Sequence, residues 1–314
     1  MLYLTILNYN TNYNKKIIYC NFLKIKKNIF ILKLKKKNNK LFLNIKQTIF
    51  FFFFFKVWNK IKFKNNLLFF TFIKKDIQSN LDGIFKLFLI SIKKKPNILN
   101  LNKIFLKLKN LIWTNIGCFD IKDFLILKIN KINLIIESID KIPFLTKYFI
   151  PKNIRISNIN RIRLGCFLSE GVTIMSEGYV NFNTYIGKNC MIEGRISAGV
   201  YISNNTDIGG SCSIMGTLSG GGSNIISIGN NCLLGANSGV GISLGNNCII
   251  EAGLYITSGT KINLILKNNK IIVKAKILSF LNNLIFYRNS INGKIECCKN
   301  YFNSEKINKD LHKN

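Results

Sequence analysis

The sequence has almost no histidine: the only one among its 314 residues is His312, close to the end of the chain. Zinc sites built on three histidines, and catalytic groups of the Ser-His-Asp or Cys-His kind, are therefore excluded from the body of the chain. Acidic residues are also few, 14 Asp and Glu against 46 Lys and Arg. If the protein is an enzyme, one of these carboxylates must transfer the proton or act as the nucleophile.

The sequence also lacks the patterns of paired cysteines, export signals and membrane spans. Its nine cysteines include no Cys-x-x-Cys pair, which disfavours a zinc or disulfide framework and predicts reduced thiols in a cytoplasmic protein. No basic segment precedes an apolar stretch at the N-terminus, so we expect no secretory signal. The six phenylalanines at 50–55 lie between Lys46 and Lys56 and are too few to span a bilayer, so no membrane partner is expected.

The formal charge of +32 is distributed unevenly. Residues 150–262 contain seven basic and five acidic residues, a net charge of +2, so the excess lies in the two flanks. There it consists mostly of lysine mixed with Asn, Ile and Phe, which is typical of compositional drift rather than of a nucleic-acid groove. We therefore expect no nucleic-acid partner.

Glycine marks out the middle of the chain. Of the 22 glycines, 19 lie between Gly165 and Gly259. This shift predicts a mixed α/β domain at 1–149, a second domain at 150–262 and a C-terminal segment at 263–314. Helix-like spacing appears at 81–95 and 101–113, whereas the first 75 or so residues carry no clear pattern.

Within the glycine-rich block, aliphatic residues recur every six positions, and the phase slips three times. Small residues often follow the aliphatic one, which is the signature of a hexapeptide-repeat parallel β-helix of about six coils, with the aliphatic side chains pointing inward. The repeating positions are Ile150, Ile156, Ile162, Leu168, Ile174, Val180, Ile186, Ile192 and Ala198, then Ile202, Ile208 and Ile214, then Ile228, Leu234 and Val240, and finally Leu244, Ile250, Ile256 and Ile262.

The longest interruption of the repeat is the glycine-rich stretch Met215–Ser223. It lacks the Lys and Ser/Thr of a P-loop, so it gives little support to nucleotide hydrolysis. Two readings remain open: an insertion at a corner of the coil, and a loop that admits an extended ligand.

The carboxylates of the block are few enough to name: Glu170, Glu177, Glu193, Asp207 and Glu251. Glu193 directly follows an inward isoleucine and precedes Arg195 by two positions, which would place the two side chains on one face of a strand. A solvated surface ion pair, worth less than about 1 kcal/mol, is the alternative to a catalytic role.

Longer motifs resemble a known family. GYVNFNTYIG (178–187), MIEGRISAGV (191–200), DIGGSCSIMGTLSGGGSNIISIG (207–229), LLGANSGVGISLG (233–245) and EAGLYITSGTK (251–261) resemble tetrahydrodipicolinate N-succinyltransferases of the actinobacterial type. The resemblance continues through IWTN (112–115), YFIP (148–151), VKA (273–275), FYRNSINGKIE (286–296) and the closing DLHKN, and so covers roughly residues 80–314.

This resemblance implies a fold, an assembly and a reaction. The fold would be a left-handed parallel β-helix with an N-terminal α/β domain and a short C-terminal segment, assembled as a homotrimer. The reaction would transfer the succinyl group of succinyl-CoA to the amine of tetrahydrodipicolinate. Its product, N-succinyl-2-amino-6-oxopimelate, belongs to lysine and diaminopimelate biosynthesis.

The resemblance also implies site residues. Glu193 of the Glu-Gly-Arg motif would be catalytic, either as a general base or as the carrier of an acyl anhydride, and Arg195 would hold a carboxylate of donor or substrate. The remaining succinyl-CoA contacts would be Gly210, Ser213, Ala236, Glu251, Ala252, Gly259, Lys274, Tyr287, Arg288, Asn289 and Ser290.

A magnesium site is implied less directly. The family places a glutamate and a second acidic residue around Mg²⁺ near the trimer axis, and these positions are Glu177 and Asn160 here. An amide oxygen can ligate Mg²⁺ but brings no charge.

Three rival functions stay open on the sequence alone. The first is a hexapeptide acyltransferase with another donor, such as acetyl-CoA. The second is a basic nucleic-acid-binding β-helix without activity, and the third is a purely structural trimer.

Overall fold

The computed structural model describes residues 80–92, 101–115, 117–121, 124, 134–216, 225–266 and 269–301, together with five short strands nearer the N-terminus. Most of the glycine-rich stretch, the phenylalanine run and His312 lie outside the described residues. The chain divides into two compact units, residues 1–85 with 100–143, and residues 86–99 with 144–314. The division therefore falls at 143–144, six residues before the expected boundary. The three-part organisation stays a prediction.

The first unit contains two antiparallel sheets. One has the strand order β2-β1-β5-β4-β3 and the other β7-β6-β8. The strands are β1 (Tyr3–Ile6), β2 (Asn21–Lys24), β3 (Lys36–Lys37), β4 (Lys40–Phe42), β5 (Leu68–Thr71), β6 (Leu111–Thr114), β7 (Gly117–Phe119) and β8 (Ile136–Asp140).

Two helices test the helix-like spacing read from the sequence. Helix α2 (Asn80–Ile92) confirms the helix expected at 81–95. Helix α3 (Leu101–Lys107) is shorter than expected, because Leu111–Thr114 form strand β6 instead of a helical end. All four residues of β6 are buried, and a short, fully apolar run does not distinguish a buried strand from a buried helix.

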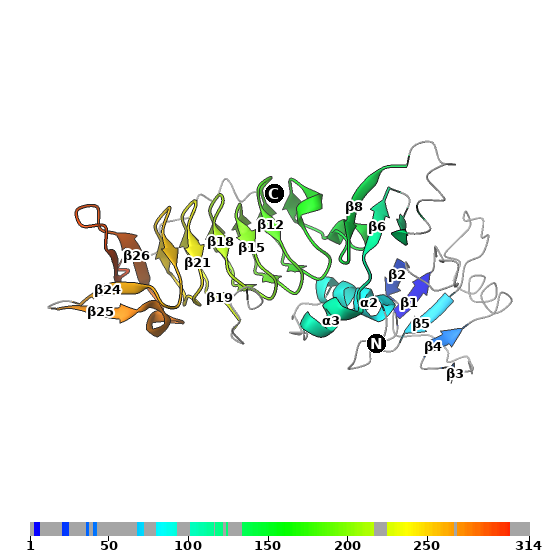
Figure 1. Ribbon diagram of the computed structural model, residues 1–314, viewed down its shortest axis with the longest axis horizontal. Helices are drawn as coiled ribbons and strands as arrows, with labels where there is room; N and C mark the ends of the chain where they lie inside the picture. Colours follow the sequence, from blue (N-terminus) through cyan, green and yellow to red (C-terminus); the bar gives the residue numbers. More distant parts are fainter. Residues whose placement is uncertain are drawn as a thin grey trace. The chain divides into compact units, whose positions relative to one another are not determined.

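The second unit is a left-handed parallel β-helix, whose coils stack one behind another (Figure 1). Two-residue strands of successive coils pair in parallel and form three sheets. Sheet 1 contains β9 (Arg155–Ile156), β11 (Thr173–Ile174), β14 (Met191–Ile192), β17 (Asp207–Ile208), β20 (Leu233–Leu234) and β22 (Ile249–Ile250). Sheet 2 contains β12 (Tyr179–Val180), β15 (Arg195–Ile196), β18 (Ser213–Ile214), β21 (Gly239–Val240) and β23 (Tyr255–Ile256). Sheet 3 contains β10 (Phe167–Leu168), β13 (Tyr185–Ile186), β16 (Tyr201–Ile202) and β19 (Ser227–Ile228).

The inward aliphatic positions confirm the six-residue repeat. Every predicted inward residue from Ile162 to Ile262 is at most 8% exposed, and each buried isoleucine contributes about 1.5–3 kcal/mol. The first predicted position is wrong, because Ile150 lies before the first strand of the coils and is 77% exposed. The first phase slip also comes earlier than expected: after Ile192 the next inward strand residue is Ile196, not Ala198.

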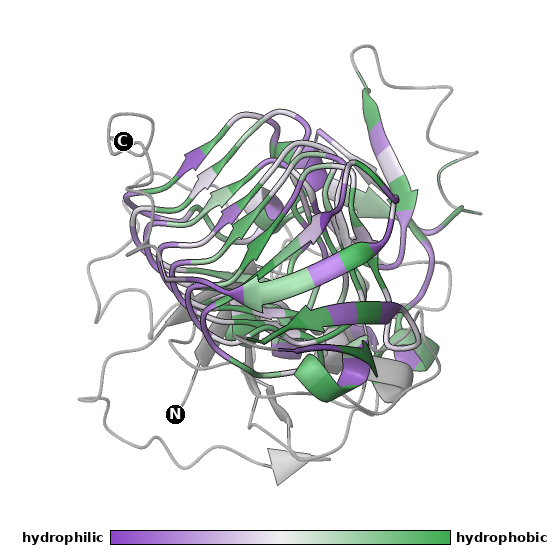
Figure 2. Ribbon diagram, turned by 90° about the vertical axis from the view of Figure 1, so that its left-hand side faces the viewer, coloured by the Kyte–Doolittle hydropathy of each residue, from purple (hydrophilic) through white to green (hydrophobic). Residues whose placement is uncertain are grey.

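One corner of the coils is built from stacked asparagines, between sheet 3 and sheet 1. The second residue before a strand of sheet 1 has a positive φ of 53–56° at Asn153, Asn189, Asn205, Asn231 and Asn247, and Asn283, directly before β26, has a φ of 58°. Asparagine tolerates this left-handed conformation. Its amide also joins neighbouring coils, as in the Asn231 Nδ2 to Asn247 Oδ1 hydrogen bond of 3.3 Å. A view along the coils shows hydrophilic residues along the corner at the left of the stack, while the strands carry both hydrophobic and hydrophilic residues (Figure 2).

Residues 86–92 of α2 pack on the first coil at Gly165, which has a φ of 98°. A side chain there would clash with Leu87, and the Gly165 N–H donates to Ser91 Oγ at 2.9 Å. Both the backbone conformation and the close approach therefore require glycine.

After the last coil the chain extends sheet 1 with a C-terminal segment. Strand β26 pairs in parallel with β22 and antiparallel with β27, while β24 pairs with β25 and β27. The elements are β24 (Lys261–Ile265), β25 (Lys270–Lys274), β26 (Leu284–Arg288) and β27 (Ile295–Lys299). Among the described residues of the unit, 3₁₀ turns form at η2 (Leu145–Lys147), η3 (Ile159–Arg161) and η4 (Ala275–Leu278). None of the helices in the described part of the chain is long and apolar enough to cross a membrane.

Candidate functional site

The corner between sheet 1 and sheet 2 is shortened at one coil. Strands of these two sheets are joined by four residues in four coils, at 175–178, 209–212, 235–238 and 251–254. Between β14 and β15 only Glu193 and Gly194 remain, and we call these two residues the short corner. This corner is two residues shorter than the others, which accounts for the first phase slip of the repeat, from Ile192 to Ile196.

Glycine is required in the short corner. A Cβ atom at Gly194 would clash with the carbonyl oxygen of Cys212 in the next coil. Because backbone rather than a flexible side chain occupies that space, a larger residue could be accommodated only by a shift of the coil. The short corner thus brings the backbone of one coil directly against the next.

Glu193 is half-buried in this corner. Its backbone N–H donates to the Ile208 carbonyl at 2.9 Å, which fixes its position on the coil. A Cβ atom built on Gly210 would lie 3.5 Å from Glu193 Oε2, so the backbone of Gly210 faces the carboxylate without filling the space beside it. Among the described residues, the Glu193 carboxylate has no hydrogen-bond or ion-pair partner, and it is therefore available to a ligand.

The expected arrangement of Glu193 and Arg195 is wrong. The two residues do not lie on one strand, because the chain turns at Gly194 from β14 of sheet 1 to β15 of sheet 2. They form no ion pair in the described structure either. Arg195 lies exposed in register with Ser213, and its positive charge opposes the effect of burial, which raises the pKa of the nearby Cys212 thiol. A ligand at the short corner would therefore meet a carboxylate on one sheet and a guanidinium on the next.

A column of equivalent positions runs along this edge from Glu193 to Glu251. The backbone N–H groups of Glu193, Gly209 and Gly235 each donate to a carbonyl of the following coil, and that of Glu251 donates to a carbonyl of β26. With about 4.8 Å between strands, the two glutamates lie roughly 14 Å apart. The residues between them are small: Gly209, Gly210, Gly235 and Ala236, with Ala252 next to Glu251. We call this part of the edge the small-residue strip.

Glu251, at the far end of the strip, differs from Glu193. Its carboxylate Oε2 accepts a hydrogen bond from the Arg288 backbone N–H at 2.6 Å. Its own N–H donates to the Phe286 carbonyl at 3.0 Å, so Glu251 joins the last coil to β26. Of the two carboxylates that directly follow a sheet 1 strand along this edge, that of Glu193 is the one without a partner among the residues the structure describes.

The other predicted contacts form two further groups. Gly259 lies in the corner 257–260 at the opposite edge of sheet 2, where the backbone of the neighbouring η4 turn donates to the Ser258 and Thr260 carbonyls. Lys274 immediately precedes η4 and is exposed. Tyr287, Arg288, Asn289 and Ser290 lead from β26 into its hairpin with β27. Within one chain, the structure therefore does not gather all predicted contacts at one edge.

The sequence analysis missed Glu296. It lies within the family-like stretch 286–296 but was assigned no role there. The side chain is only 3% exposed, and the Tyr287 hydroxyl donates to its Oε2 at 3.0 Å. The feature that reveals Glu296 is the antiparallel register, which places it directly opposite Tyr287. The sequence analysis did not use it, because the register of a hairpin is set by its turn.

Asn160 and Glu177 do not form a magnesium site within one chain. Both are exposed, and the Arg161 guanidinium donates a hydrogen bond of 2.9 Å to the Glu177 carbonyl, which places a cation next to Glu177. The residues that the structure describes contain no group of three His, Cys, Asp or Glu that could hold a metal ion. A magnesium ion would need ligands from other chains, and no step of the reaction below depends on one.

Comparisons with known proteins agree in pointing to one family. A family model described as the hexapeptide repeat of succinyl-transferase matches residues 225–258. The chain is 44% identical over 243 residues to a protein of Pseudomonas putida, and the match covers 75% of this chain and 70% of that protein. It is 46% identical over 244 residues to a protein of Vibrio cholerae, with 76% and 71% covered. Both relatives are named 2,3,4,5-tetrahydropyridine-2,6-dicarboxylate N-succinyltransferase, the systematic name of the tetrahydrodipicolinate enzyme.

A solved structure extends the likeness over almost the whole chain. A crystal structure from Campylobacter jejuni, described as a 2,3,4,5-tetrahydropyridine-2-carboxylate N-succinyltransferase, has a TM-score of 0.79 and 28% sequence identity. The match covers 99% of this chain and 93% of the Campylobacter jejuni chain. None of these relatives is actinobacterial, so the expected actinobacterial type stays a prediction.

Proposed function

The chain belongs to the family of tetrahydrodipicolinate N-succinyltransferases, and from this membership we propose that Glu193 is the catalytic residue of its reaction. The protein is an acyltransferase of lysine and diaminopimelate biosynthesis with succinyl-CoA as co-substrate. One water opens the cyclic imine of tetrahydrodipicolinate, which gives a free amine and the 6-oxo group. Transfer of the succinyl group to that amine then gives N-succinyl-2-amino-6-oxopimelate and free CoA. The observation that carries the assignment of Glu193 is its half-buried, unengaged carboxylate in the short corner.

The reaction proceeds by direct transfer within a complex of both substrates. The substrate nitrogen attacks the thioester carbonyl, and Glu193 removes its proton as the N–C bond forms. The C–S bond then breaks, and the proton on Glu193 passes to the sulfur of the leaving CoA. With no histidine among residues 1–311, no imidazole can take over this role. The alternative, an acyl anhydride on Glu193, uses the same carboxylate as a nucleophile.

The strip explains how the donor could approach Glu193. Gly209, Gly210, Gly235 and Ala236 present no large side chain, so an extended pantetheine arm can lie close to the backbone of the coils. Arg195 offers a planar guanidinium that binds the free carboxylate of a succinyl group in a bidentate manner. Lys274 and Arg288 supply positive charge for the phosphates of the cofactor.

We also propose that the working protein is a cytoplasmic homotrimer. Glu193 and Lys274 belong to groups at opposite edges of sheet 2, which favours a cleft that uses Glu193 of one chain and Lys274 of its neighbour. In such a trimer, Glu177 and Asn160 of several chains would supply the ligands of a magnesium ion. Neither a membrane nor a nucleic acid is expected as a partner.

The decisive experiment measures thiol release from succinyl-CoA with and without tetrahydrodipicolinate. We expect release that depends on the acceptor and that is much faster with succinyl-CoA than with acetyl-CoA. Equal rates with both donors would favour a hexapeptide acyltransferase of different specificity. No release and no binding of either donor would contradict the proposed function.

A further inference from the structure

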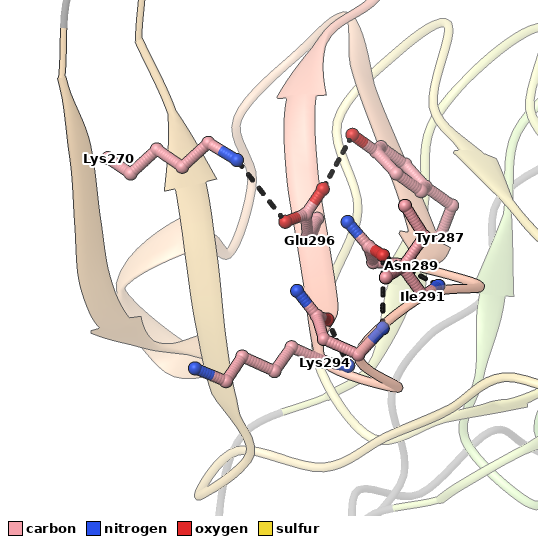
Figure 3. A network of polar contacts seen from close by, with 7 residues as sticks. Lys270, Tyr287, Asn289, Ile291, Lys294 and Glu296 are labelled. Carbon is pink, nitrogen blue, oxygen red and sulfur yellow. Dashed lines mark hydrogen bonds and ion pairs between the residues drawn. The ribbon is translucent and has the colours of Figure 1, made fainter.

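Glu296 is a buried carboxylate that contacts side chains from two other strands. On β27 it is 3% exposed, and it receives the Tyr287 hydroxyl of β26 at 3.0 Å and approaches Lys270 Nζ of β25 at 3.6 Å. Figure 3 shows Glu296 between these two side chains, with Asn289 close by. The site proposed above assigns Glu296 no role.

The surroundings of Glu296 favour its charged form. Burial by itself would raise the pKa of this carboxyl, but hydrogen bonds from Tyr287 and Asn289 and the charge of Lys270 outweigh it and hold the pKa below its usual value. A buried charge is tolerated only with such partners. The same hydrogen bond, together with desolvation as the larger cause, raises the pKa of Tyr287 to about 12, so the phenol stays neutral and donates.

The partners of Glu296 belong to the segment that reaches the end of the small-residue strip. Tyr287 follows the β26 residue that pairs with Ile250, and the Arg288 N–H donates to Glu251 at 2.6 Å. Asn289 organises the hairpin loop, since its Oδ1 accepts from Ile291 N at 2.9 Å. Two carboxylates, Glu251 and Glu296, thus hold residues 287–289 from two sides.

We infer that Glu296 is a positioning residue for the acyl-CoA donor: it fixes Tyr287 and Asn289 so that residues 287–290 present a preformed surface to CoA. This inference rests on the proposed function, in which that segment contacts the donor. The positive charge nearby, from Arg288, Lys270 and Lys294, suits a phosphate-bearing ligand, whereas Glu296 is turned away from solvent and acts only through its neighbours.

The test measures CoA binding by calorimetry, steady-state kinetics and thermal unfolding for Glu296→Ala and Glu296→Gln. We expect Glu296→Ala to weaken CoA binding and raise the KM for succinyl-CoA by about tenfold, with kcat and the KM for tetrahydrodipicolinate changed less than about threefold. Glutamine still accepts from Tyr287 but brings no charge, so Glu296→Gln should retain the fold and show an intermediate effect. In a Tyr287→Phe background, the effect of Glu296→Gln should shrink, because the two changes remove one shared interaction.

A matched control is Glu170→Gln, which alters an exposed glutamate that is hydrogen-bonded to Asn153 in the first coils. It should bind CoA like the wild type. Wild-type CoA affinity in folded Glu296→Gln and Glu296→Ala would overturn the inference. So would equal losses of kcat, of CoA affinity and of tetrahydrodipicolinate affinity that accompany a lower unfolding temperature, because they would indicate a general loss of stability. If wild-type protein binds CoA but transfers no succinyl group, the proposed function fails while the positioning role is still measured by binding.

Discussion

Glu193 and Glu251 both follow a strand of sheet 1, three coils apart, yet they differ in what they bind. The Glu251 carboxylate accepts the Arg288 N–H and so fastens the C-terminal segment to the coils. The Glu193 carboxylate is unengaged within the described structure and faces the backbone of Gly210. A carboxylate that already serves as a structural acceptor is a poor base, which supports our proposal that Glu193 rather than Glu251 is the catalytic residue.

Glu193→Gln should keep the fold and the binding of succinyl-CoA but lose turnover. Glutamine is nearly isosteric and preserves the packing around Ile192, but it can neither take up a proton nor form an anhydride. Loss of a general base lowers kcat by about 10²–10⁴. The measurement is kcat together with the thermal shift caused by succinyl-CoA. A near-normal kcat would move attention to Glu251, and a lost thermal shift would mean that Glu193 serves binding. Hydroxylamine trapping on the wild type separates base from anhydride, because only an acylated glutamate yields a hydroxamate.

Arg195→Lys should raise the KM for succinyl-CoA and reduce the preference for it over acetyl-CoA. The Arg195 guanidinium is exposed on sheet 2 next to Ser213, and a bidentate bond to the succinyl carboxylate is worth about 1.5–3 kcal/mol. An ammonium group does not reproduce that geometry. The comparison is kcat/KM for the two donors in each protein. If the ratio does not change, Arg195 binds the carboxylates of the acceptor instead.

At the scale of an element, the short corner joins the repeat to the site. Four residues separate sheets 1 and 2 elsewhere, and two separate them at Glu193. The shorter turn brings Gly194 against Cys212 and leaves the Glu193 side chain next to a coil whose corner begins with Gly209 and Gly210. The interruption of the repeat thus creates the space beside the carboxylate.

Gly194→Ala should destabilise the fold by about 1–3 kcal/mol, because the added methyl group clashes with backbone that cannot move alone. Its control is Gly259→Ala, where a Cβ would meet nothing within 4 Å and the backbone conformation is ordinary; there we expect a change within about 0.5 kcal/mol. Denaturant unfolding of both variants makes the comparison. Equal stability of the two variants would contradict the close packing of the short corner.

The stability of the β26–β27 hairpin should fall at high pH. The Tyr287 pKa is raised to about 12, with desolvation as the main cause and the Glu296 hydrogen bond next, so the neutral phenol is favoured in the folded state. Its stabilising contribution is therefore complete below pH 10, the ordinary tyrosine value, and is lost as the pH rises toward 12. An ultraviolet difference titration of wild type against Tyr287→Phe should show one phenol ionising near pH 12. A difference centred at pH 10 would contradict the buried hydrogen bond.

At the scale of the whole molecule, the proposed site is divided among separate groups. The Glu193 and Lys274 groups lie at opposite edges of sheet 2, and the coil block carries few titratable residues with which to complete a site. A stack of parallel coils presents flat sheet faces, and neighbouring chains packed on such faces would leave clefts between them. Assembly and catalysis are therefore expected to be linked.

Mixing Glu193→Gln with Lys274→Ala protein should restore part of the activity that each lacks, if the two residues act in one cleft from different chains. Random reassortment of subunits then produces some clefts with both native residues. Activity after mixing and re-equilibration is the measurement, and each variant mixed with itself is the control. An active monomer in sedimentation at the working concentration would contradict the trimer.

The sequence by itself determined the inward face of the coils and the identity of the family. A six-residue period is a local property, because each aliphatic residue lies in one short strand that is followed by one corner. The buried positions from Ile162 to Ile262 follow this period. The prediction from the repeat was wrong at Ile150, which fits the six-residue spacing but lies before the first strand of the coils and is exposed. The helix predicted at 101–113 was too long because a short apolar run can form either a helix or a strand, and here its end forms β6.

Only the tertiary structure decided which side chains meet. The separation of Glu193 and Arg195 onto two sheets depends on a corner of two residues, and the engagement of Glu251 depends on β26 pairing with the last coil. The burial of Glu296 depends on the register of a hairpin and on Lys270 from a third strand. A repeat specifies how each coil folds, whereas contacts between coils and the segment that follows them depend on positions far apart in the chain, which periodicity does not encode.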